Sequence, residues 1–484
     1  MNPKHMKMIE EARELDRTDQ QEQALLAYRR YLGLQPRDAG AWADCGGLLM
    51  VMGQLEEAQK ACDKALCIDT TNAGAMINMG CILTQRGQCG EAEGWFRRVL
   101  VKNPRRVDAR MALVESLIKQ SKLSQAREEL SKAIEHDPGN APAHQALGQI
   151  FHRMGMWCEY QAEIDRFGSI DPDSAYVEYE RGYLDLLFGN LTSGWQGYEA
   201  RLKVPGLVGP KRPFAEPQWS GESFVGKTLL LHYEQGFGDT LMFVRYAPLV
   251  KALGGRVVLV AQAQLADLVA TCQGVDEVIP HGLPLPPFDL HCSLLSLPRI
   301  FNTELESIPV EVPYLDVPEM VPNRDQIAEL LAASTKQFRI GLVWAGHSIH
   351  KNDLVRSVPA GLLQPLTALP EVAWYSLQPG MNEEAPFPAI TALGPHLHNF
   401  SDTAYAMSGM DLVISVDTAP AHLAGALGVP VLMLLPFSPD WRWMLGRDDS
   451  PWYPTMRIYR QQEPGDWEGV IHLVVANLTA GQGV

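Results

Sequence analysis

The chain has 484 residues, of which 46% are hydrophobic and 20% are charged, a balance typical of globular domains with cores of their own. Its formal net charge of −16 disfavours a nucleic-acid surface. No apolar run approaches the roughly 18 residues of a membrane span, residues 1–15 lack the apolar core of a signal peptide, and the eight cysteines include no C-x-x-C pair. We therefore expect a cytoplasmic protein of two to four domains with reduced thiols.

Internal repeats dominate residues 5–205. Each period of 34 residues predicts a helical hairpin, because alanine lets two helices approach closely and proline ends the second helix. A single hairpin cannot bury its apolar face, so we expect neighbouring hairpins to stack into a superhelix. The recurring positions are Ala24, Ala58, Ala92 and Ala126 in one phase, and Pro36, Thr70, Pro104, Pro138 and Pro172 in another.

This spacing resembles the tetratricopeptide repeat (TPR). We interpret it as five repeats followed by a degenerate sixth hairpin, residues 176–202, that caps the array. The resemblance implies a concave groove that holds a polypeptide, and a purely structural scaffold is the alternative.

A small α/β domain is expected after the repeats, over residues 227–325, behind a proline- and glycine-containing linker at 206–226. Its first strand, 227–233, leads into a glycine-containing loop, Glu234 to Thr240, and then into an amphipathic helix over 241–253. The remaining predicted elements are strands at 256–260, 275–279 and 288–291 and a helix at 263–270.

A second α/β domain is expected over residues 326–484. Within it, residues 411–436 predict a βαβ unit with a strand at 412–416, a helix at 419–427 and a strand at 431–435. Asp417 and Thr418 are good N-cap residues for that helix, whose N–H groups and dipole would meet at the carboxyl end of a parallel sheet, where phosphates bind. The other predicted elements are strands at 339–344 and 372–377 and a helix at 466–477.

Candidate site residues follow strands in both α/β domains, so the cleft between the domains is the expected site. Lys351 and Arg356 lie in a polar loop directly after a strand and fit a phosphate or diphosphate, although a solvated charged face is the alternative. Asp239 stands near a helix start and fits a general base, a role compatible with helix capping. His422 fits either a structural or a functional role.

The Gly238-Asp239 loop and the Asp417-Thr418-x-x-x-His422 segment are similar to the heptosyltransferases of glycosyltransferase family 9. That resemblance implies a GT-B pair of Rossmann-like domains. Residues 5–480 as a whole resemble bacterial TPR glycosyltransferases with a heptosyltransferase-like catalytic half, some of which are similar to flagellin glycosyltransferases that attach nonulosonic acids. The fold class expected is thus α + α/β, a TPR superhelix followed by the GT-B pair.

The same resemblance implies roles for individual residues. Asp239 would deprotonate the acceptor hydroxyl, with Gly236, Gly238 and Thr240 on the acceptor side of the site. Lys351 would neutralise the donor phosphate. The remaining donor-binding positions are Asp417, Thr418, Ala419 and His422, with Arg356 added from its charge and position; Ala419 stands where the family usually has glycine.

The function implied is transfer of a sugar from a CMP-, ADP- or UDP-linked donor to a hydroxyl of a protein acceptor, flagellin among the candidates, by an inverting, metal-independent reaction without a further cofactor. The pair Asp448-Asp449 is the nearest approach to a metal-binding D-x-D motif, and its setting favours a structural turn. A catalytically inactive repeat scaffold and a transferase that acts on a saccharide or lipid are the alternatives.

Overall fold

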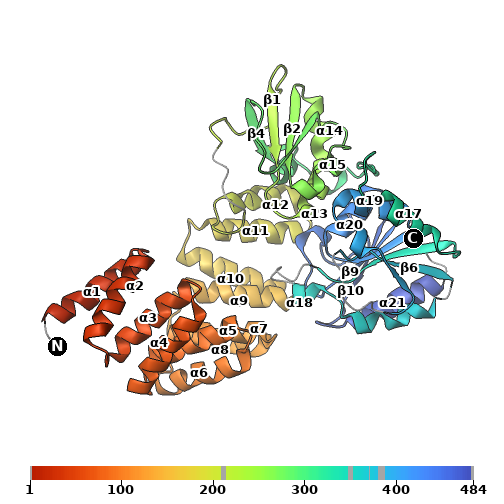
Figure 1. The fold of residues 1–484 in the computed structure, drawn as a ribbon. Coiled ribbons are helices and arrows are strands. Elements are labelled where there is room, and N and C mark those ends of the chain that lie inside the picture. The colour runs from red at the N-terminus through yellow and green to blue at the C-terminus, as the bar shows by residue number, and fades with distance from the viewer. Residues whose placement is uncertain (1–2, 209–213, 347–352, 370, 380–386, 481–484) are drawn as a thin grey trace. The chain divides into compact units, whose positions relative to one another are not determined.

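The computed structural model describes residues 3–208, 214–346, 353–369, 371–379 and 387–480 (Figure 1). The chain divides into two compact units, residues 1–172 and 173–484. Within the described ranges, no helix is both long enough and apolar enough to cross a membrane.

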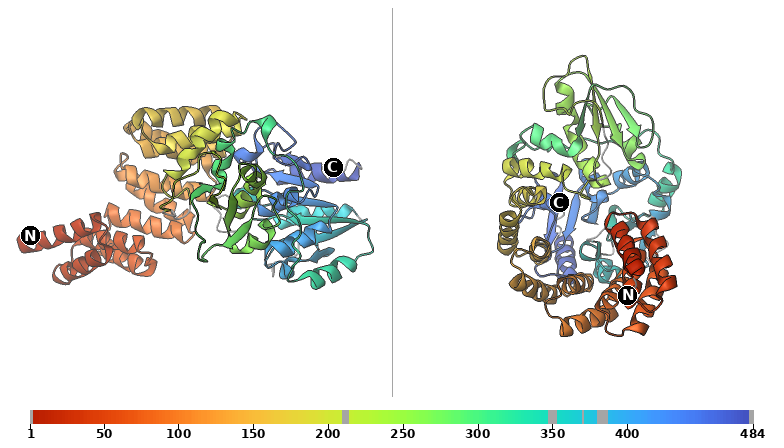
Figure 2. Two further views of the ribbon diagram at one scale, coloured as in Figure 1. Left: turned by 90° about the horizontal axis from the view of Figure 1, so that it is seen from above. Right: turned by 90° about the vertical axis from the view of Figure 1, so that its left-hand side faces the viewer.

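The N-terminal unit consists of helical hairpins that follow one another along the chain (Figures 1 and 2). Each second helix ends two residues before a recurring proline or Thr70, so the repeat pattern of the sequence is confirmed. The helices are α1 (Pro3–Arg17), α2 (Gln21–Leu34), α3 (Ala39–Val51), α4 (Leu55–Ile68), α5 (Ala73–Gln85), α6 (Cys89–Lys102), α7 (Val107–Lys119), α8 (Leu123–His136), α9 (Ala141–Arg153) and α10 (Trp157–Ile170).

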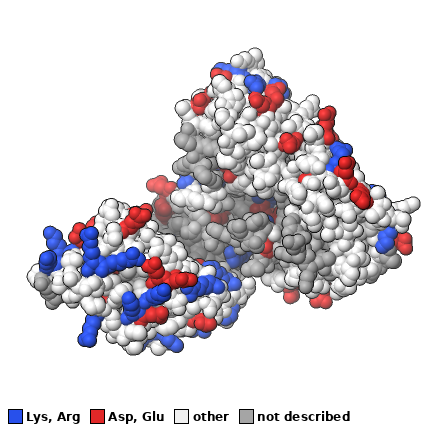
Figure 3. Space-filling model, in the orientation of Figure 1, with Lys and Arg blue, Asp and Glu red and all other residues white. Residues whose placement is uncertain are grey.

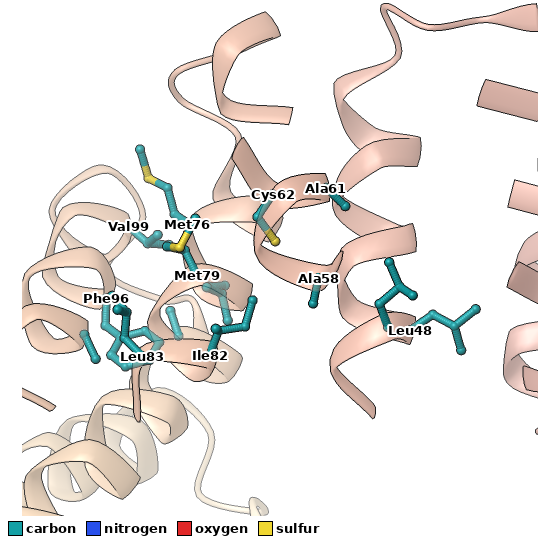
Figure 4. Packing of buried hydrophobic residues seen from close by; sticks show 14 of the residues in the cluster. Leu48, Ala58, Ala61, Cys62, Met76, Met79, Ile82, Leu83, Phe96 and Val99 are labelled. Carbon is teal, nitrogen blue, oxygen red and sulfur yellow. The ribbon is translucent and has the colours of Figure 1, made fainter. Parts of the chain in front are cut away.

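Small residues set the helix spacing in this unit. The alanines of the 34-residue period are 0% exposed. A Cβ at Gly80 would lie 2.5 Å from the Phe96 ring, and one at Gly46 would lie 2.8 Å from Cys62 Sγ, so only glycine permits these close approaches. Figure 4 shows the apolar side chains that pack between the helices, including Phe96 beside Leu83 within the α5–α6 hairpin.

The surface of the N-terminal unit is charged with both signs. Basic and acidic side chains are interspersed on the face shown in Figure 3. Arg29 pairs with Glu57 at 2.7 Å, and Arg13 pairs with Asp44 at 2.8 Å, in each case between different hairpins. These exposed pairs contribute little stability. The packing of the hairpins is therefore stabilised mainly by the buried apolar residues between them, which the small alanines and glycines allow to come close.

The C-terminal unit contains two sheets, and all of their strands pair in parallel. The four-stranded sheet has the order β3-β2-β1-β4, and the six-stranded sheet has the order β10-β9-β8-β5-β6-β7. The strands are β1 (Thr228–His232), β2 (Arg256–Ala261), β3 (Glu277–Pro280), β4 (Leu290–Ser293), β5 (Phe338–Val343), β6 (Val372–Ser376), β7 (Ile390–Ala392), β8 (Leu412–Val416), β9 (Val431–Leu435) and β10 (Met456–Arg460).

Helices cover these sheets and supply the strand-to-helix turns. A single helix was expected at 241–253, but this segment forms α13 (Phe237–Phe243), the 3₁₀ turn η2 (Val244–Tyr246) and α14 (Ala247–Ala252). Because α13 begins at Phe237, Asp239 belongs to its first turn rather than to a loop. The helices are α13 (Phe237–Phe243), α14 (Ala247–Ala252), α15 (Ala266–Val269), α16 (Leu297–Ile300), α17 (Arg324–Ala332), α18 (Asp353–Arg356), α19 (Phe400–Ser408), α20 (Ala419–Ala426) and α21 (Trp467–Thr479). A GT-B type of α/β region, the expected fold class, follows the TPR-like helices.

The last helical hairpin packs with the α/β region. It comprises α11 (Ala175–Leu187), α12 (Leu191–Tyr198) and the 3₁₀ turn η1 (Glu199–Leu202), and the compact units divide before it rather than at residue 205. The Trp195 Nε1–H donates a hydrogen bond to the Thr303 carbonyl at 3.1 Å, and its ring meets the Trp441 ring edge-on at 5.3 Å. The hairpin therefore belongs to the C-terminal unit, whereas we had assigned it to the repeat array as a unit that caps the array against the next domain.

Candidate functional site

The turn between β8 and α20 lies at the carboxyl end of a central strand of the larger sheet. Thr418 occupies the N-cap position of α20, but its side chain makes no capping hydrogen bond. Its hydroxyl donates instead to the Val416 carbonyl at 3.2 Å. The expected capping by the Thr418 side chain is therefore absent, and the first turn of α20 presents the Ala419 N–H ahead of Pro420.

Arg356 reaches this turn from a segment 61 residues away. Its Nη1 donates to the Asp417 carbonyl at 3.1 Å, and its Nε lies 3.4 Å from Asp353 Oδ1. A Cβ at Gly346 would collide with both of these side chains, so glycine makes the arrangement possible. The prediction that the β5 loop and the β8 turn meet is confirmed for Arg356, whereas Lys351 lies outside the described residues.

Asp239 is held in the first turn of α13 by two contacts. Its Oδ2 accepts a hydrogen bond from the Gly236 N–H at 2.9 Å, and its Oδ1 forms an ion pair with Arg442 Nη2. The two side chains are 14% and 10% exposed, so the pair is mostly shielded from water. This contact joins the helix that follows β1 to the segment that follows β9.

Arg442 is the site residue that sequence reasoning missed. It lies in the 3₁₀ turn η8 (Trp441–Trp443), where Asp440 Oδ1 accepts hydrogen bonds from its backbone N–H at 3.0 Å and from its Nη1 at 2.7 Å. Its guanidinium stacks 4.3 Å above the Trp441 ring. Burial alone would lower the pKa of Arg442, but Asp440 and Asp239 outweigh it and raise that pKa. The available signal was a lone arginine between two tryptophans shortly after a buried strand.

His422 points into the interior between α13 and α20. Its ring is 5% exposed, its Nδ1 lies 2.9 Å from the Tyr453 hydroxyl, and a Cβ at Gly238 would come within 2.9 Å of its Cδ2. Burial, followed by the charges of Arg442 and Arg245, lowers the pKa of His422 well below its usual value. A neutral imidazole therefore packs the two halves of the unit together, and its contact with a donor stays a prediction.

The Asp417 carboxyl is unusual among the acidic groups of the site. Burial and the nearby Asp440 raise its pKa to about 6, although Trp443, Arg442 and Arg356 act in the opposite direction. The group is therefore partly protonated near pH 6, and it can accept or donate a hydrogen bond to a ligand hydroxyl there.

The loop before Asp239 is anchored at several points. The Thr240 hydroxyl donates to Gln262 Oε1 at 2.9 Å, and the Gln262 amide donates to the Gln235 carbonyl at 3.1 Å. Glu234, at the start of the loop, forms a two-pronged ion pair with Arg201 from the last helical hairpin, at 2.9 and 2.7 Å. These contacts fix the positions of Gly236, Gly238 and Asp239 before any ligand arrives.

Two family models match the chain. Residues 9–167 match the cilia and flagella-associated protein 70 middle TPR-like domain, and residues 373–464 match glycosyltransferase family 9 (heptosyltransferase). The second match includes the β8–α20 turn and Arg442 but not Asp239. Both resemblances expected from the sequence are thus confirmed: the chain joins an N-terminal TPR-like domain to a C-terminal heptosyltransferase-like domain.

Among curated proteins, Protein FlbA of Caulobacter vibrioides is 28% identical over 334 residues, which cover 63% of this chain. The match spans 55%, just over half, of that relative's own length. Among solved structures, PilW, a widely conserved type IV pilus biogenesis factor, is 19% identical over 42% of this chain and 93% of its own, with a TM-score of 0.38. YrrB, a TPR protein with an unusual peptide-binding site, is 24% identical over 36% and 90%, with a TM-score of 0.30.

Proposed function

We propose that this chain is a glycosyltransferase that moves a sugar from a nucleotide-activated donor to a hydroxyl of a protein acceptor bound by the TPR-like helices. The observation that carries this proposal is the pairing of Asp239 with Arg442, which joins the candidate base in α13 to the heptosyltransferase-like domain. The same helix packs on α20, since a Cβ at Gly238 would come within 2.9 Å of His422 Cδ2. The acceptor-side loop and the donor-side turn come from different parallel sheets, as a two-substrate cleft requires.

The donor phosphate would lie at the turn between β8 and α20. Arg356 supplies a fixed positive charge, and the Ala419 N–H supplies an oriented donor at the helix start. Lys351, Thr418 and His422 complete the donor side in this proposal. The Asp417 carboxyl would bind a hydroxyl of the ribose or of the transferred sugar.

The reaction in this proposal is a single displacement that inverts the anomeric carbon. The acceptor oxygen forms a bond to that carbon while the bond from carbon to phosphate oxygen breaks, and the phosphate leaves with the bonding electrons. The acceptor proton goes to Asp239. Arginine charge and helix N–H groups stabilise the leaving phosphate, where negative charge develops, and in this scheme they take the place of a metal ion.

The acceptor class follows from the repeats. A TPR-like superhelix ahead of the transferase region supplies a surface for a polypeptide, so a protein hydroxyl, on flagellin or another substrate, is the proposed acceptor. An inactive scaffold is the second candidate, and a saccharide acceptor is the third. Intact-mass comparison of the proteome with and without the gene identifies the acceptor and the mass of the sugar.

The base assignment is tested with purified enzyme and the donor and acceptor so identified. Asp239→Asn should lower single-turnover transfer by about 100-fold or more, the usual scale for a lost general base. The control is Asp449→Asn, which removes an exposed carboxylate paired with Arg447 and should transfer at the parent rate. NMR of the product should show the inverted anomer. Transfer by Asp239→Asn at the parent rate would exclude Asp239 as the base, and a retained anomer would exclude the single displacement.

A further inference from the structure

Arg442 is shared by carboxylates from both halves of the α/β unit. Asp440 binds it from its own turn at 2.7 Å, and Asp239 binds it from α13 beside the smaller sheet. The guanidinium also lies over the Trp441 ring, and the whole residue is 8% exposed. An arginine held in this way has a well-defined position and little contact with bulk water, which strengthens its ion pairs.

The contact with Arg442 blocks the role proposed for Asp239. One oxygen of the Asp239 carboxylate accepts from the Gly236 N–H, and the other is paired with Arg442 Nη2. With one contact at each oxygen, the carboxylate has fewer lone pairs open to an acceptor hydroxyl than a free carboxylate has. Moving Arg442 away would open the Oδ1 side of Asp239 to the acceptor.

Arg442 also lies close to the proposed phosphate site. The ring of Trp443, the next residue in the chain, packs against that of His422 in α20 with centroids 5.2 Å apart, and Arg356 is bonded to the Asp417 carbonyl just before α20. A donor diphosphate at this turn carries more negative charge than the Asp239 carboxylate. It also offers several oxygens to the planar guanidinium fork, so it can compete for Arg442.

We propose that Arg442 changes partner during the reaction, pairing with Asp239 before a donor is bound and with the leaving phosphate of the donor afterwards. This inference rests on the proposed function and deepens it. The exchange does two things at once: it places a second cation on the departing phosphate, and it frees Asp239 to take the acceptor proton. Asp239 can act as a base only after the donor has bound, so donor binding precedes deprotonation of the acceptor.

The test measures binding of inorganic pyrophosphate to the full chain by calorimetry, without any need for the natural donor. Arg442→Gln should bind pyrophosphate about tenfold more weakly than the parent, because a charged hydrogen-bond donor is lost. Asp239→Asn should bind it about tenfold more tightly, because the competing carboxylate is gone. Arg447→Gln is the matched control, since it neutralises an arginine of the same segment that pairs with Asp449, and it should bind like the parent.

The double variant Asp239→Asn/Arg442→Gln separates partner exchange from simple repulsion. If Asp239 acts by competing for Arg442, its substitution should change affinity by no more than about twofold once Arg442 is absent. An equal gain with and without Arg442 means that Asp239 repels the anion at a distance, and this result overturns the exchange. Unchanged affinity in both single variants also overturns it and leaves the phosphate site of the proposed function standing. If the parent binds no pyrophosphate, the phosphate site and the exchange both fail.

Folding of each variant is checked by circular dichroism and thermal unfolding. Where Arg442→Gln does not fold, Arg442→Lys takes its place, because it keeps the charge and loses the two-pronged geometry. Arg442→Lys should lose less pyrophosphate affinity than the roughly tenfold loss expected for Arg442→Gln. Adding Asp239→Asn to Arg442→Lys should then raise the affinity by less than it does in the parent. Asp239→Asn leaves Arg442 paired with Asp440, so its tighter binding remains measurable in either case.

Discussion

Asp417 and His422 follow the same strand but respond to burial in opposite ways. Burial raises the pKa of the carboxyl to about 6 and lowers that of the imidazole, because in both cases it disfavours the charged form. Near neutral pH the site therefore holds an uncharged imidazole at His422 and, at Asp417, a carboxylate that is costly to ionise. Ionisation of the Asp417 carboxyl therefore lowers the free energy of unfolding, and this change can be measured.

Asp417 should make the native state less stable as the pH rises from about 4 to about 6. Its pKa is near 3.8 in the unfolded chain and about 6 in the folded chain, so the native state binds the proton more tightly between these values. The stabilisation is complete below pH 4 and is lost as the pH passes the folded value. The difference of two units corresponds to about 3 kcal/mol.

The variant Asp417→Asn isolates this effect because it cannot ionise. Its urea midpoint, relative to that of the parent, should rise as the pH goes from 4 to 7. The exposed Asp449→Asn, whose carboxylate has a lowered pKa and a surface partner, should show no such rise. A constant difference between Asp417→Asn and the parent across this range would contradict the raised pKa.

At the scale of elements, Arg201 connects the last helical hairpin to Glu234, in the loop that precedes α13 and Asp239. It is 1% exposed and binds Glu234 through two hydrogen bonds, the Ser296 hydroxyl at 3.0 Å and Glu199 at 3.1 Å. Removing one partner of a buried pair leaves the other charge unpaired in a poorly solvated place. Through Arg201 and Glu234, the hairpin fixes the position of the loop before Asp239.

Arg201→Ala should destabilise the C-terminal unit by about 3–5 kcal/mol, the scale for breaking a buried ion pair. Lys203→Ala provides the comparison, because Lys203 faces Glu178 across 3.8 Å with most of its side chain in water, and it should cost less than about 0.5 kcal/mol. Denaturant unfolding of both variants measures the difference. Similar losses of stability in Arg201→Ala and Lys203→Ala would show that the buried contacts of Arg201 do not stabilise the unit.

In the larger sheet, the accuracy of the strand predictions depended on where each strand lies; in the smaller sheet, the edge strands β3 and β4 were both predicted to within a few residues. The central strands β8 and β9 were predicted to the residue, because each is a fully buried apolar run bounded by turn-forming residues. The strands at the two edges, β7 and β10, were not predicted, since the first has three residues and the second includes two arginines. Edge strands lack the continuous apolar signal of a doubly covered strand.

Local sequence patterns could not predict where α13 begins or that Asp239 pairs with Arg442. Gly236 and Gly238 make residues 234–240 read as a loop, yet the helix begins between them because the Asp239 carboxylate accepts the Gly236 N–H. The contact of Asp239 with Arg442 joins residues 203 positions apart. Residue type and spacing indicated Asp239 as a candidate base and indicated the β8–α20 turn, and only the folded chain shows that Asp239 is paired with Arg442.

At the scale of the whole molecule, the repeat pattern and the packing divide the chain at different places. The sequence repeats extend to about residue 205, whereas the compact units divide after Pro172. The sixth hairpin resembles the repeats in sequence, but Trp195 packs on Trp441 and Trp452, and Arg201 neutralises Glu234. It is a TPR-like hairpin that has become part of the C-terminal unit.

This division predicts which fragments fold on their own. Residues 1–172 and residues 173–484 should each unfold cooperatively, because each keeps its buried contacts. A fragment of residues 206–484 should not, because it exposes the aromatic surface that Trp195 covers and leaves Glu234 without Arg201 in a site from which water was excluded. Circular dichroism, thermal unfolding and limited proteolysis compare the three fragments. A fragment of residues 206–484 as stable as that of residues 173–484 would mean that the hairpin adds no stability to the α/β region, and it would contradict the anchoring role given to Arg201.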